Sequence, residues 1–349
     1  VAPLVYEHCV PCHRPGGGGP FPLRTYDDVR RRGTEIATVT KMRFMPPWLP
    51  ERGHGGPFVG ERGLTAEQVG ILQQWIFEGM ERGDPGDLPP EPRFVDGWEH
   101  GEPDLVARFD RPYSLPAGGS DVFRTFVIPA PGSGERWVRG WEFRAENPEV
   151  VHHATIEVDR TGSARRLEEI DPEPGFSGMR AEGAHMPDGH FVGWVPGRRP
   201  TWLPDGMAWG LTPETDLVVQ LHMLPSGKVE PVQPELGLYF ADGPPTETPM
   251  MIRLGKRLID IPAGASEYAI ADGYRLPVDV EVRSLFPHAH YLGQDLKGFA
   301  TLPDGTKRWL VWVRDWDFNW QDEYRFREPV VLPAGTTLGM RVTFDNSAS

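Results

Sequence analysis

The sequence predicts a multidomain protein in which a small all-α domain precedes two antiparallel β-sandwich domains. Helical periodicity is found near the N-terminus, whereas short alternating or apolar runs between Gly and Pro turns fill the rest of the chain. The 349 residues include 41 Gly, 38 Pro and 12 Trp, a composition typical of many turns and short strands. A chain of this length is expected to form two or three domains.

Charge and composition exclude several classes of protein. A net charge of −14 argues against a nucleic-acid-binding surface, because phosphate contacts need clustered Lys and Arg. No run of about 18 apolar residues is present, so we expect no membrane span. Two cysteines cannot form a disulfide framework in a chain of this size. No signal peptide is recognised and the first residue lies near a motif, so a mature or trimmed chain is expected.

Both cysteines lie in one motif, Cys9-Val10-Pro11-Cys12-His13, which has the C-x-x-C-H pattern of c-type haem attachment. Two thiols on one helical turn can reach both vinyl groups of haem while the adjacent histidine faces the iron. A redox dithiol would need a βαβ context, and a zinc site would need two more ligands although no further cysteine is available. We therefore expect covalent haem c, attached at Cys9 and Cys12 and ligated by His13.

A second iron ligand is expected downstream, and Met45 is the preferred candidate. Met45 precedes Pro46 and Pro47, and a residue before proline avoids the helical region, so an extended loop is expected there. The alternative is that Met45 is an ordinary loop residue packed on Trp48. The weaker candidates for the ligand are Met42, His8 and His54.

A helix is predicted to begin after Thr65, an N-cap with Gln68 at the capping-box position. Its apolar stripe, taken alone, is more typical of an ordinary core than of a cofactor wall. The stripe consists of Val69, Leu72, Ile76 and Met80. Crossed N- and C-terminal helices are the usual plan of the cytochromes c that the motif resembles. Residues 1–85 are therefore predicted to form a cytochrome c domain, and residues 86–104 a linker.

Strand patterns recur beyond the linker. The clearest runs, each alternating or apolar, lie at 122–128, 155–158, 217–222 and 278–282. Alternation with period two indicates half-buried strands. No long helical segment separates these runs, so antiparallel sheets are expected. One β-sandwich is placed at 105–245 and the second at 246–349.

Five of the eleven histidines lie on or beside these strands, in three clusters: His152–His153, His222, and His288 with His290. His152 and His153 would point to opposite faces of a regular strand, so they can share a metal only if the strand is bulged or twisted. His288 and His290, two residues apart, are expected on one strand face, which suits a single ion. A lone strand histidine such as His222 is more often structural, but the clusters together favour metal binding. Imidazole suits copper, zinc, iron and nickel alike.

The order His-His, Gln-x-His and His-x-His resembles the copper type II, ascorbate-dependent monooxygenases, which include peptidylglycine α-hydroxylating monooxygenase and dopamine β-monooxygenase. The likeness covers roughly residues 105–349. It includes the stretches GWVPG at 193–197, LPDGM at 203–207 and PHAHYLG at 287–293. With the haem motif and the Met45 region in front, the layout is similar to bacterial members that carry a cytochrome c domain.

This resemblance implies two jelly-roll-like domains with one copper in each, facing across an open, solvent-filled cleft. It implies that His152, His153 and His222 hold the electron-transfer copper. His288 and His290 would hold the copper at which oxygen binds. The family completes that second site with a Met from a Glu-Met motif. Either this ligand is expected beyond Ser349, or the second site is incomplete. The disulfides of the animal enzymes have no counterpart here.

The preferred hypothesis is a periplasmic or exported redox enzyme, a copper-dependent monooxygenase that hydroxylates a C–H bond with O2 and receives electrons through the haem. The expected electron donor is ascorbate or a redox protein, and the substrate is an unidentified small molecule or peptide. One alternative is a non-catalytic copper-binding protein for electron transfer or copper handling. Another is a structural pair of sandwiches with hydrogen-bonded histidines. Two coppers per haem would support the enzyme; one or none would support the alternatives.

Overall fold

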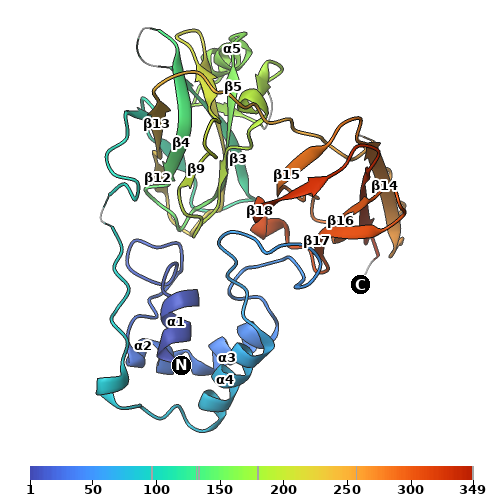
Figure 1. Cartoon of the computed structure of the whole chain (residues 1–349). Helices are drawn as coiled ribbons and strands as arrows, with labels where there is room; N and C mark the ends of the chain where they lie inside the picture. Colours follow the sequence, from blue (N-terminus) through green and yellow to red (C-terminus); the bar gives the residue numbers. More distant parts are fainter. Residues whose placement is uncertain (96, 131, 133, 179–180, 257, 348–349) are drawn as a thin grey trace. The chain divides into compact units, whose positions relative to one another are not determined.

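The structure is a computed structural model that describes residues 1–95, 97–130, 132, 134–178, 181–256 and 258–347. The described part is mostly β-structure with few helices, and its sheets are antiparallel (Figure 1). The chain divides into two compact units, each built from segments that are distant in sequence. We call residues 2–28 and 85–251 the central unit, and residues 1, 29–84 and 252–349 the terminal unit.

The N-terminal helices are shared between these units. Helix α1 (Ala2–His8) belongs to the central unit, and α2 (Tyr26–Arg31) spans the division. Helices α3 (Gly33–Lys41) and α4 (Ala66–Phe77) belong to the terminal unit and pack on each other. The domain boundaries expected from the sequence therefore stay a prediction. The longest described helix, α4, has 12 residues, and no described helix combines the length and apolar character that crossing a bilayer requires.

The predicted capping box at the start of α4 is confirmed. The Thr65 hydroxyl accepts the Gln68 N–H at 3.1 Å, and the Gln68 side chain accepts the Thr65 N–H at 2.8 Å. Of the predicted stripe only Leu72 is fully buried. Helix α4 ends at Phe77, before Met80 of that stripe. Met80 packs against the start of α3, because an added Cβ at Gly33 would lie 2.3 Å from its sulfur.

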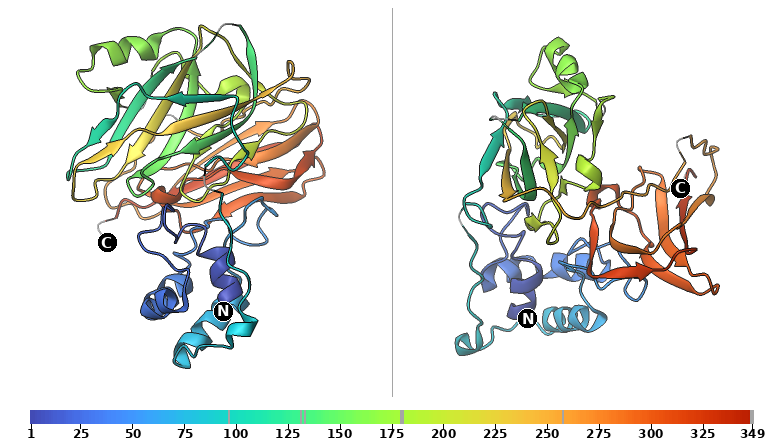
Figure 2. Two further views of the ribbon diagram at one scale, coloured as in Figure 1. Left: turned by 90° about the vertical axis from the view of Figure 1, so that its left-hand side faces the viewer. Right: turned by 45° about the horizontal axis from the view of Figure 1, so that its top comes forward.

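The central unit contains two large antiparallel sheets and one small one (Figures 1 and 2). The five-stranded sheet has the order β1 (Leu105–Arg108), β13 (Glu235–Ala241), β4 (Arg136–Arg144), β10 (Trp209–Leu211), with β9 (Thr201–Trp202) also on β4. The six-stranded sheet has the order β6 (Phe176–Ser177), β3 (Val122–Pro129), β11 (Asp216–Met223), β5 (Val151–Asp159), β7 (Ala184–His185), with β8 (Gly193–Trp194) also on β5. The small sheet pairs β12 (Glu230–Val232) with β2 (Tyr113–Leu115). One hydrophobic cluster includes buried side chains from both large sheets.

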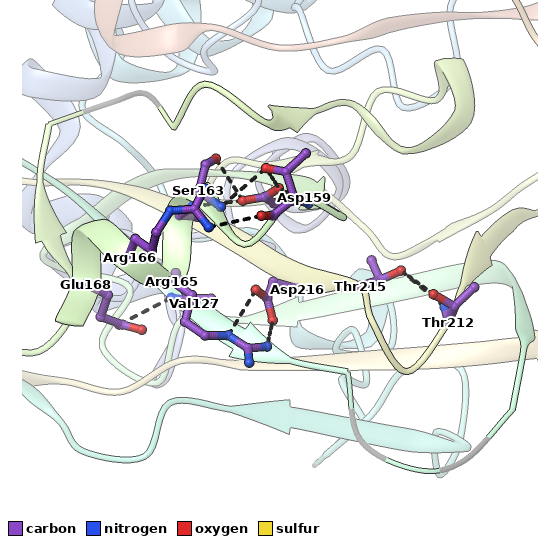
Figure 3. Close-up of polar contacts among 11 residues, drawn as sticks. Val127, Asp159, Ser163, Arg165, Arg166, Glu168, Thr212, Thr215 and Asp216 are labelled. Carbon is purple, nitrogen blue, oxygen red and sulfur yellow. Dashed lines mark hydrogen bonds and ion pairs between the residues drawn. The ribbon is translucent and has the colours of Figure 1, made fainter.

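Strand β11 departs from the predicted alternation, because nearly all of its residues are buried. Leu217 belongs to the main hydrophobic cluster, whereas Val218 belongs to a second cluster on the other side, which also contains Ala164. Ala164 lies on α5 (Ser163–Ile170), a helix that the sequence patterns did not predict. An ion pair between Arg165 on α5 and Asp216 on β11, with Nη2 and Oδ1 2.5 Å apart, holds the helix to the sheet (Figure 3). The helix therefore covers the face that was expected to meet solvent.

A buried carboxylate organises the start of α5. Asp159, labelled in Figure 3 beside Ser163, lies at the end of β5 and accepts the N–H groups of Thr161 and Ala164 at 2.7 and 2.8 Å. It also accepts the hydroxyls of Thr161 and Ser163 at 2.7 and 2.9 Å. Burial alone raises the pKa of Asp159, but these four hydrogen bonds outweigh it and lower the pKa from 3.8 to about 2.

The terminal unit contains a four-stranded and a two-stranded antiparallel sheet, coloured orange to red in Figure 2. The four-stranded sheet has the order β14 (Tyr268–Arg275), β19 (Thr337–Phe344), β16 (Gly293–Thr301), β17 (Lys307–Val313). The other sheet pairs β15 (Val280–Leu285) with β18 (Tyr324–Leu332). Their buried side chains form one cluster, which also includes Phe58 from the segment between α3 and α4. Residues 348–349, at the end of the predicted second sandwich, lie outside the described part.

Replacement of Asp159 by Asn is expected to destabilise the protein by about 2 kcal/mol at neutral pH, because the amide NH2 cannot accept hydrogen bonds. The folded-state pKa of Asp159 is depressed, so its contribution is present above the unfolded pKa of 3.8 and is lost as the pH falls through about 2. The difference in the free energy of unfolding between the unaltered protein and Asp159→Asn should therefore shrink as the pH falls from 3.8 to about 2. Urea unfolding at several pH values measures this difference. The exposed Asp242→Asn variant is the control. An equal deficit at all pH values would contradict this account.

Candidate metal centres

His152, His153 and His222 are brought together by a break in strand register. Strands β5 and β11 are neighbours, and His153 pairs with His222. The register then shifts, so that Met223 pairs with Val151 and His152 is the extra residue on β5. This irregularity is the bulge that the sequence required if both adjacent histidines were to serve one ion.

The Nδ1 atoms of the three rings converge. Nδ1 of His153 lies 3.3 Å from Nδ1 of His152 and 3.4 Å from Nδ1 of His222. One candidate ligand atom from each residue lies within 4.8 Å of the others. Two nitrogens bound at about 2.0 Å to one ion, at a tetrahedral angle, lie about 3.3 Å apart. The three imidazoles therefore have a spacing that fits a single metal ion.

Asp121 and Phe123 fix the His222 ring. The ring is fully buried, and Nε2 donates to Oδ2 of Asp121 at 2.9 Å. Phe123, the register partner of His222 on β3, stacks on it with centroids 4.2 Å apart and planes at 4°. Because a carboxylate only accepts, Nε2 carries the hydrogen and Nδ1 keeps its lone pair on the side of the other histidines.

The protonation state of His222 also suits metal binding. Burial lowers its pKa, and the hydrogen bond and charge of Asp121 only partly counteract this shift. The neutral ring, the form that binds metals, is therefore favoured. Asp121 was not predicted from the sequence. The available signal was its position directly before β3, the strand that pairs with β11 at His222.

His288 and His290 do not lie on a strand, which corrects the expectation that they share a strand face. Strand β15 ends at Leu285, and both histidines follow in an irregular segment. Pro287 has no N–H to donate to a ladder, which accounts for the end of the strand. The two rings are nevertheless neighbours, with centroids 5.1 Å apart and planes at 89°.

Gln321 orients His288. Nε2 of Gln321 donates to the carbonyl oxygen of Phe318 at 3.0 Å, so its Oε1 faces Nδ1 of His288, 2.5 Å away. An amide oxygen only accepts, so Nδ1 carries the hydrogen and Nε2 has the lone pair. Burial lowers the pKa of His288, the Gln321 hydrogen bond opposes this, and His290 lowers it further. Gln321, which is buried, was not predicted from the sequence.

Cys9 and Cys12 lie on a single helical turn directly after α1. The N–H groups of Cys12 and His13 both donate to the Cys9 carbonyl, at 3.2 and 2.9 Å. Both cysteines are half-buried, and they are not joined in a disulfide. Burial, followed by the neighbouring Cys12, raises the pKa of Cys9 to about 12, so Cys9 is a thiol at neutral pH. Cys9 and Cys12 thus lie three residues apart on one backbone turn, and haem attachment there stays a prediction.

The His13 ring, like those of His222 and His288, is oriented by a hydrogen bond from one of its nitrogens to an oxygen of the protein. Its Nδ1 donates to the Phe21 carbonyl at 3.0 Å, so Nε2 has the lone pair. Gly19 lies so close that an added Cβ would be 2.8 Å from His13 Nδ1. A Cβ on Gly18 would be 2.9 Å from Cβ of Pro196, which lies just beyond β8. Strand β8 pairs with β5 at Ala154, next to His153, so contacts within the central unit connect the His13 turn with the three-histidine cluster.

Met45 lies in a loop after α3, as predicted. It is half-buried, and its N–H donates to the Val39 carbonyl at 3.2 Å. Met42, a weaker candidate, is 72% exposed. Met45 belongs to the terminal unit and Cys9–His13 to the central unit, so its role as the second iron ligand stays a prediction.

Comparison with known proteins gives no assignment. A scan of the chain against protein-family models and a search of curated proteins each found no match. The motifs and the arrangement of the histidines therefore carry the functional inference.

Removal of the Asp121 carboxylate should weaken metal binding by the three-histidine cluster. We expect Asp121→Ala to lower copper affinity by about 10- to 100-fold, because the His222 ring loses the partner that fixes its tautomer and orientation. Chelator competition in a His288→Ala background would isolate this site. Asp205→Asn, at an exposed carboxylate of the same unit, is the control. Unchanged affinity in Asp121→Ala would show that Asp121 does not orient the ligand.

Proposed function

We propose that this chain is a periplasmic or exported copper- and haem-containing redox protein of the monooxygenase type. One oxygen atom of O2 would enter a C–H bond, the other would leave as water, and two electrons and two protons would be consumed. The observation that carries the proposal is the three-imidazole cluster in the same compact unit as a C-x-x-C-H turn. The electron donor would be ascorbate or a redox protein, and the substrate a small molecule or peptide.

We infer that the sheets sharing a core in each unit are β-sandwiches of the jelly-roll-like kind. This layout would give each unit one candidate copper site. His152, His153 and His222 would hold one ion in the central unit. His288 and His290 would hold the other in the terminal unit. A copper ion at either site supplies one-electron redox chemistry, and the imidazole donor set suits it.

The turn after α1 suits covalent haem. The S–H bonds of Cys9 and Cys12 would add across the two vinyl groups to form thioethers, and His13 would present Nε2 to the iron. Bound haem supplies a one-electron entry point, whose potential is raised if Met45 is the second ligand. The contact of Gly18 with Pro196, and of β8 with β5, favours the three-histidine cluster as the first acceptor of electrons.

A non-catalytic electron-transfer or copper-handling protein is the second candidate. It is favoured by the small donor set at His288 and His290, where Gln321 already uses its oxygen to accept from His288. Such a protein would bind copper and haem but would consume no O2 beyond slow oxidation of the reductant. The two candidates therefore differ in substrate-dependent O2 uptake.

The proposal predicts a defined metal content for the exported protein. We expect one haem that stays attached in acid acetone, and two copper sites of unequal affinity. The three-imidazole site should fill first, because the second has two imidazoles and needs water or another ligand to complete it. Copper titration with haem quantified by pyridine haemochrome measures both.

Two variants assign the sites. His222→Ala should lose the tighter copper, whereas His288→Ala should change only the weaker one. Haem that extracts into acid acetone, two equally tight sites, or zinc bound more tightly than copper would each contradict the assignment. O2 uptake with reductant across a panel of candidate substrates then separates the enzyme from the electron-transfer protein.

A further inference from the structure

The four-stranded sheet of the terminal unit has two faces of opposite character. Its strands β14, β16 and β17 are labelled in Figure 1, and β19 lies between β14 and β16. Residues that pair directly across antiparallel strands have their side chains on the same face. One such row is buried in the core of the unit and consists of Ile270, Val342, Leu296 and Val313. The rows that alternate with it belong to the opposite face, which we call the outer face.

The register defines the outer face row by row, from β14 towards β17. The rows are Ala269, Thr343 and Asp295; Ala271, Arg341, Lys297 and Trp312; Gly273, Gly339, Phe299 and Trp309; and Arg275, Thr337, Thr301 and Lys307. Leu310 is an extra residue on β17, so Trp309 and Trp312 share a face although they are three positions apart. Arg314, which follows β17, lies over the Trp312 ring and belongs to the same face.

Positive charge dominates the outer face. Its cationic side chains are Arg275, Lys297, Lys307, Arg314 and Arg341, and its one carboxylate among the rows above is Asp295. Oδ1 of Asp295 pairs with Nζ of Lys297 at 2.5 Å, and Oδ2 accepts the Nε1 hydrogen of Trp312 at 2.7 Å. The other four cations are exposed and form no ion pair with any residue that the structure describes. In a chain of net charge −14 this excess is a local property of one sheet face.

Aromatic rings hold Lys307 in place. Its Nζ lies 3.8 Å from the ring centroid of Phe299 and 4.4 Å from that of Trp309. Gly339, the register partner of Phe299, leaves room for the phenyl ring, because an added Cβ would lie 2.5 Å from it. The ammonium group is therefore ordered on two rings at the surface of the sheet.

Trp312 orders two further cations in the same way. Nζ of Lys297 lies 4.7 Å and Cζ of Arg314 4.6 Å from its ring centroid. The indole itself is fixed by its hydrogen bond to Asp295 and by stacking on Trp309, with centroids 5.5 Å apart and planes at 13°. Cationic side chains that are ordered before a ligand arrives lose less conformational entropy when they bind an anion.

The spacing of the unpaired cations indicates a ligand with several anionic groups. Adjacent strands lie about 4.8 Å apart and residues rise about 3.4 Å along a strand. The backbones at Arg341 and Lys307, two strands and four residues apart, are therefore separated by about 10 Å across the sheet and about 13 Å along it. A single small anion cannot meet both side chains, whereas an extended chain with repeated acidic groups can.

The other side chains of the outer face favour a sugar chain over other polyanions. Thr301 and Thr337 place hydroxyl groups between the cations, and the rows above contain no aliphatic side chain larger than alanine. The centre of a protein–protein interface is typically more apolar than this. Single-stranded nucleic acids stack their bases on aromatic rings, but the rings here already carry cations.

We propose that the outer face of this sheet binds acidic polysaccharides, whose carboxylates pair with the four unpaired cations and whose hydroxyls bond to the threonines between them. All the residues involved belong to the terminal unit. The binding site is separate from the proposed haem and copper sites and does not require either group.

Calorimetric titration of the full chain with an oligogalacturonate of defined length tests the proposal. We expect binding at low ionic strength that weakens as salt is added, because the contacts are exposed ion pairs. The same oligomer in its methyl-esterified form should not bind, because esterification removes the charges and keeps the sugar rings.

Two substitutions on the outer face should weaken this binding. Lys307→Gln and Arg341→Gln should each lower the affinity about threefold, and the double variant about tenfold, because exposed ion pairs are individually weak and these two are far apart. The matched control is Arg308→Gln, which removes an exposed cation from the same strand. Arg308 pairs with the core residue Ala300, so it lies on the other side of the sheet, and its loss should leave the affinity unchanged. If Lys307→Gln fails to fold, Arg314→Gln tests the same expectation.

Several outcomes would overturn the proposal. These are the absence of oligogalacturonate binding, equal affinity for the methyl ester, or an equal loss of affinity in Arg308→Gln. Tighter binding of oligo-dT would assign the face to a nucleic acid, and equally tight binding of poly-L-glutamate to an acidic protein. Salt-sensitive self-association that is lost in Arg341→Gln would assign it to a second copy of the chain.

Discussion

The candidate sites depend on one interaction, a hydrogen bond that ties one nitrogen of an imidazole to a protein acceptor. The acceptor receives a hydrogen bond from the N–H of that nitrogen, so the other nitrogen keeps its lone pair. At each site a different kind of oxygen does this. The acceptors are the Phe21 carbonyl for His13, the Asp121 carboxylate for His222 and the Gln321 amide for His288. Each ring is thereby oriented for a ligand before any metal arrives, which lowers the cost of binding.

The fold supplies these acceptors through its antiparallel strands and their irregular ends. Asp121 stands before β3, which lies beside β11, so the register places it next to His222. The extra residue on β5 brings His152 to the same side as His153. Burial serves the same purpose, because it lowers the pKa of His222 and His288 and favours the neutral rings that bind metals.

Sequence patterns predicted those features that depend only on residues close together in the chain. The Cys9–His13 turn, the capping box at Thr65 and the loop at Met45 depend on residues a few positions apart, and the structure has all three. The need for a bulge at His152 and His153 also followed from period-two geometry. Copper, haem and catalysis stay proposals, because they rest on the motifs and on a resemblance.

The features that the sequence patterns missed depend on contacts between residues that are distant in the chain. Asp121 lies 101 residues from His222, and Gln321 lies 33 residues from His288, so no local pattern marks either acceptor. Strand β11 is buried on both faces because α5 packs on the second one. Helix α5 is short and rich in charged residues, so its sequence did not predict a helix. The departure of His288 from its strand was readable in Pro287, but spacing alone suggested a shared face.

The imidazole tautomers in the metal-free protein test this account most directly. Long-range ¹H–¹⁵N correlation spectra distinguish Nδ1–H from Nε2–H rings, and His222→Ala and His288→Ala variants assign the signals. The account predicts that His222 is an Nε2–H tautomer and His288 an Nδ1–H tautomer at neutral pH. The opposite tautomer at either residue, or a rapidly averaging ring, would contradict it.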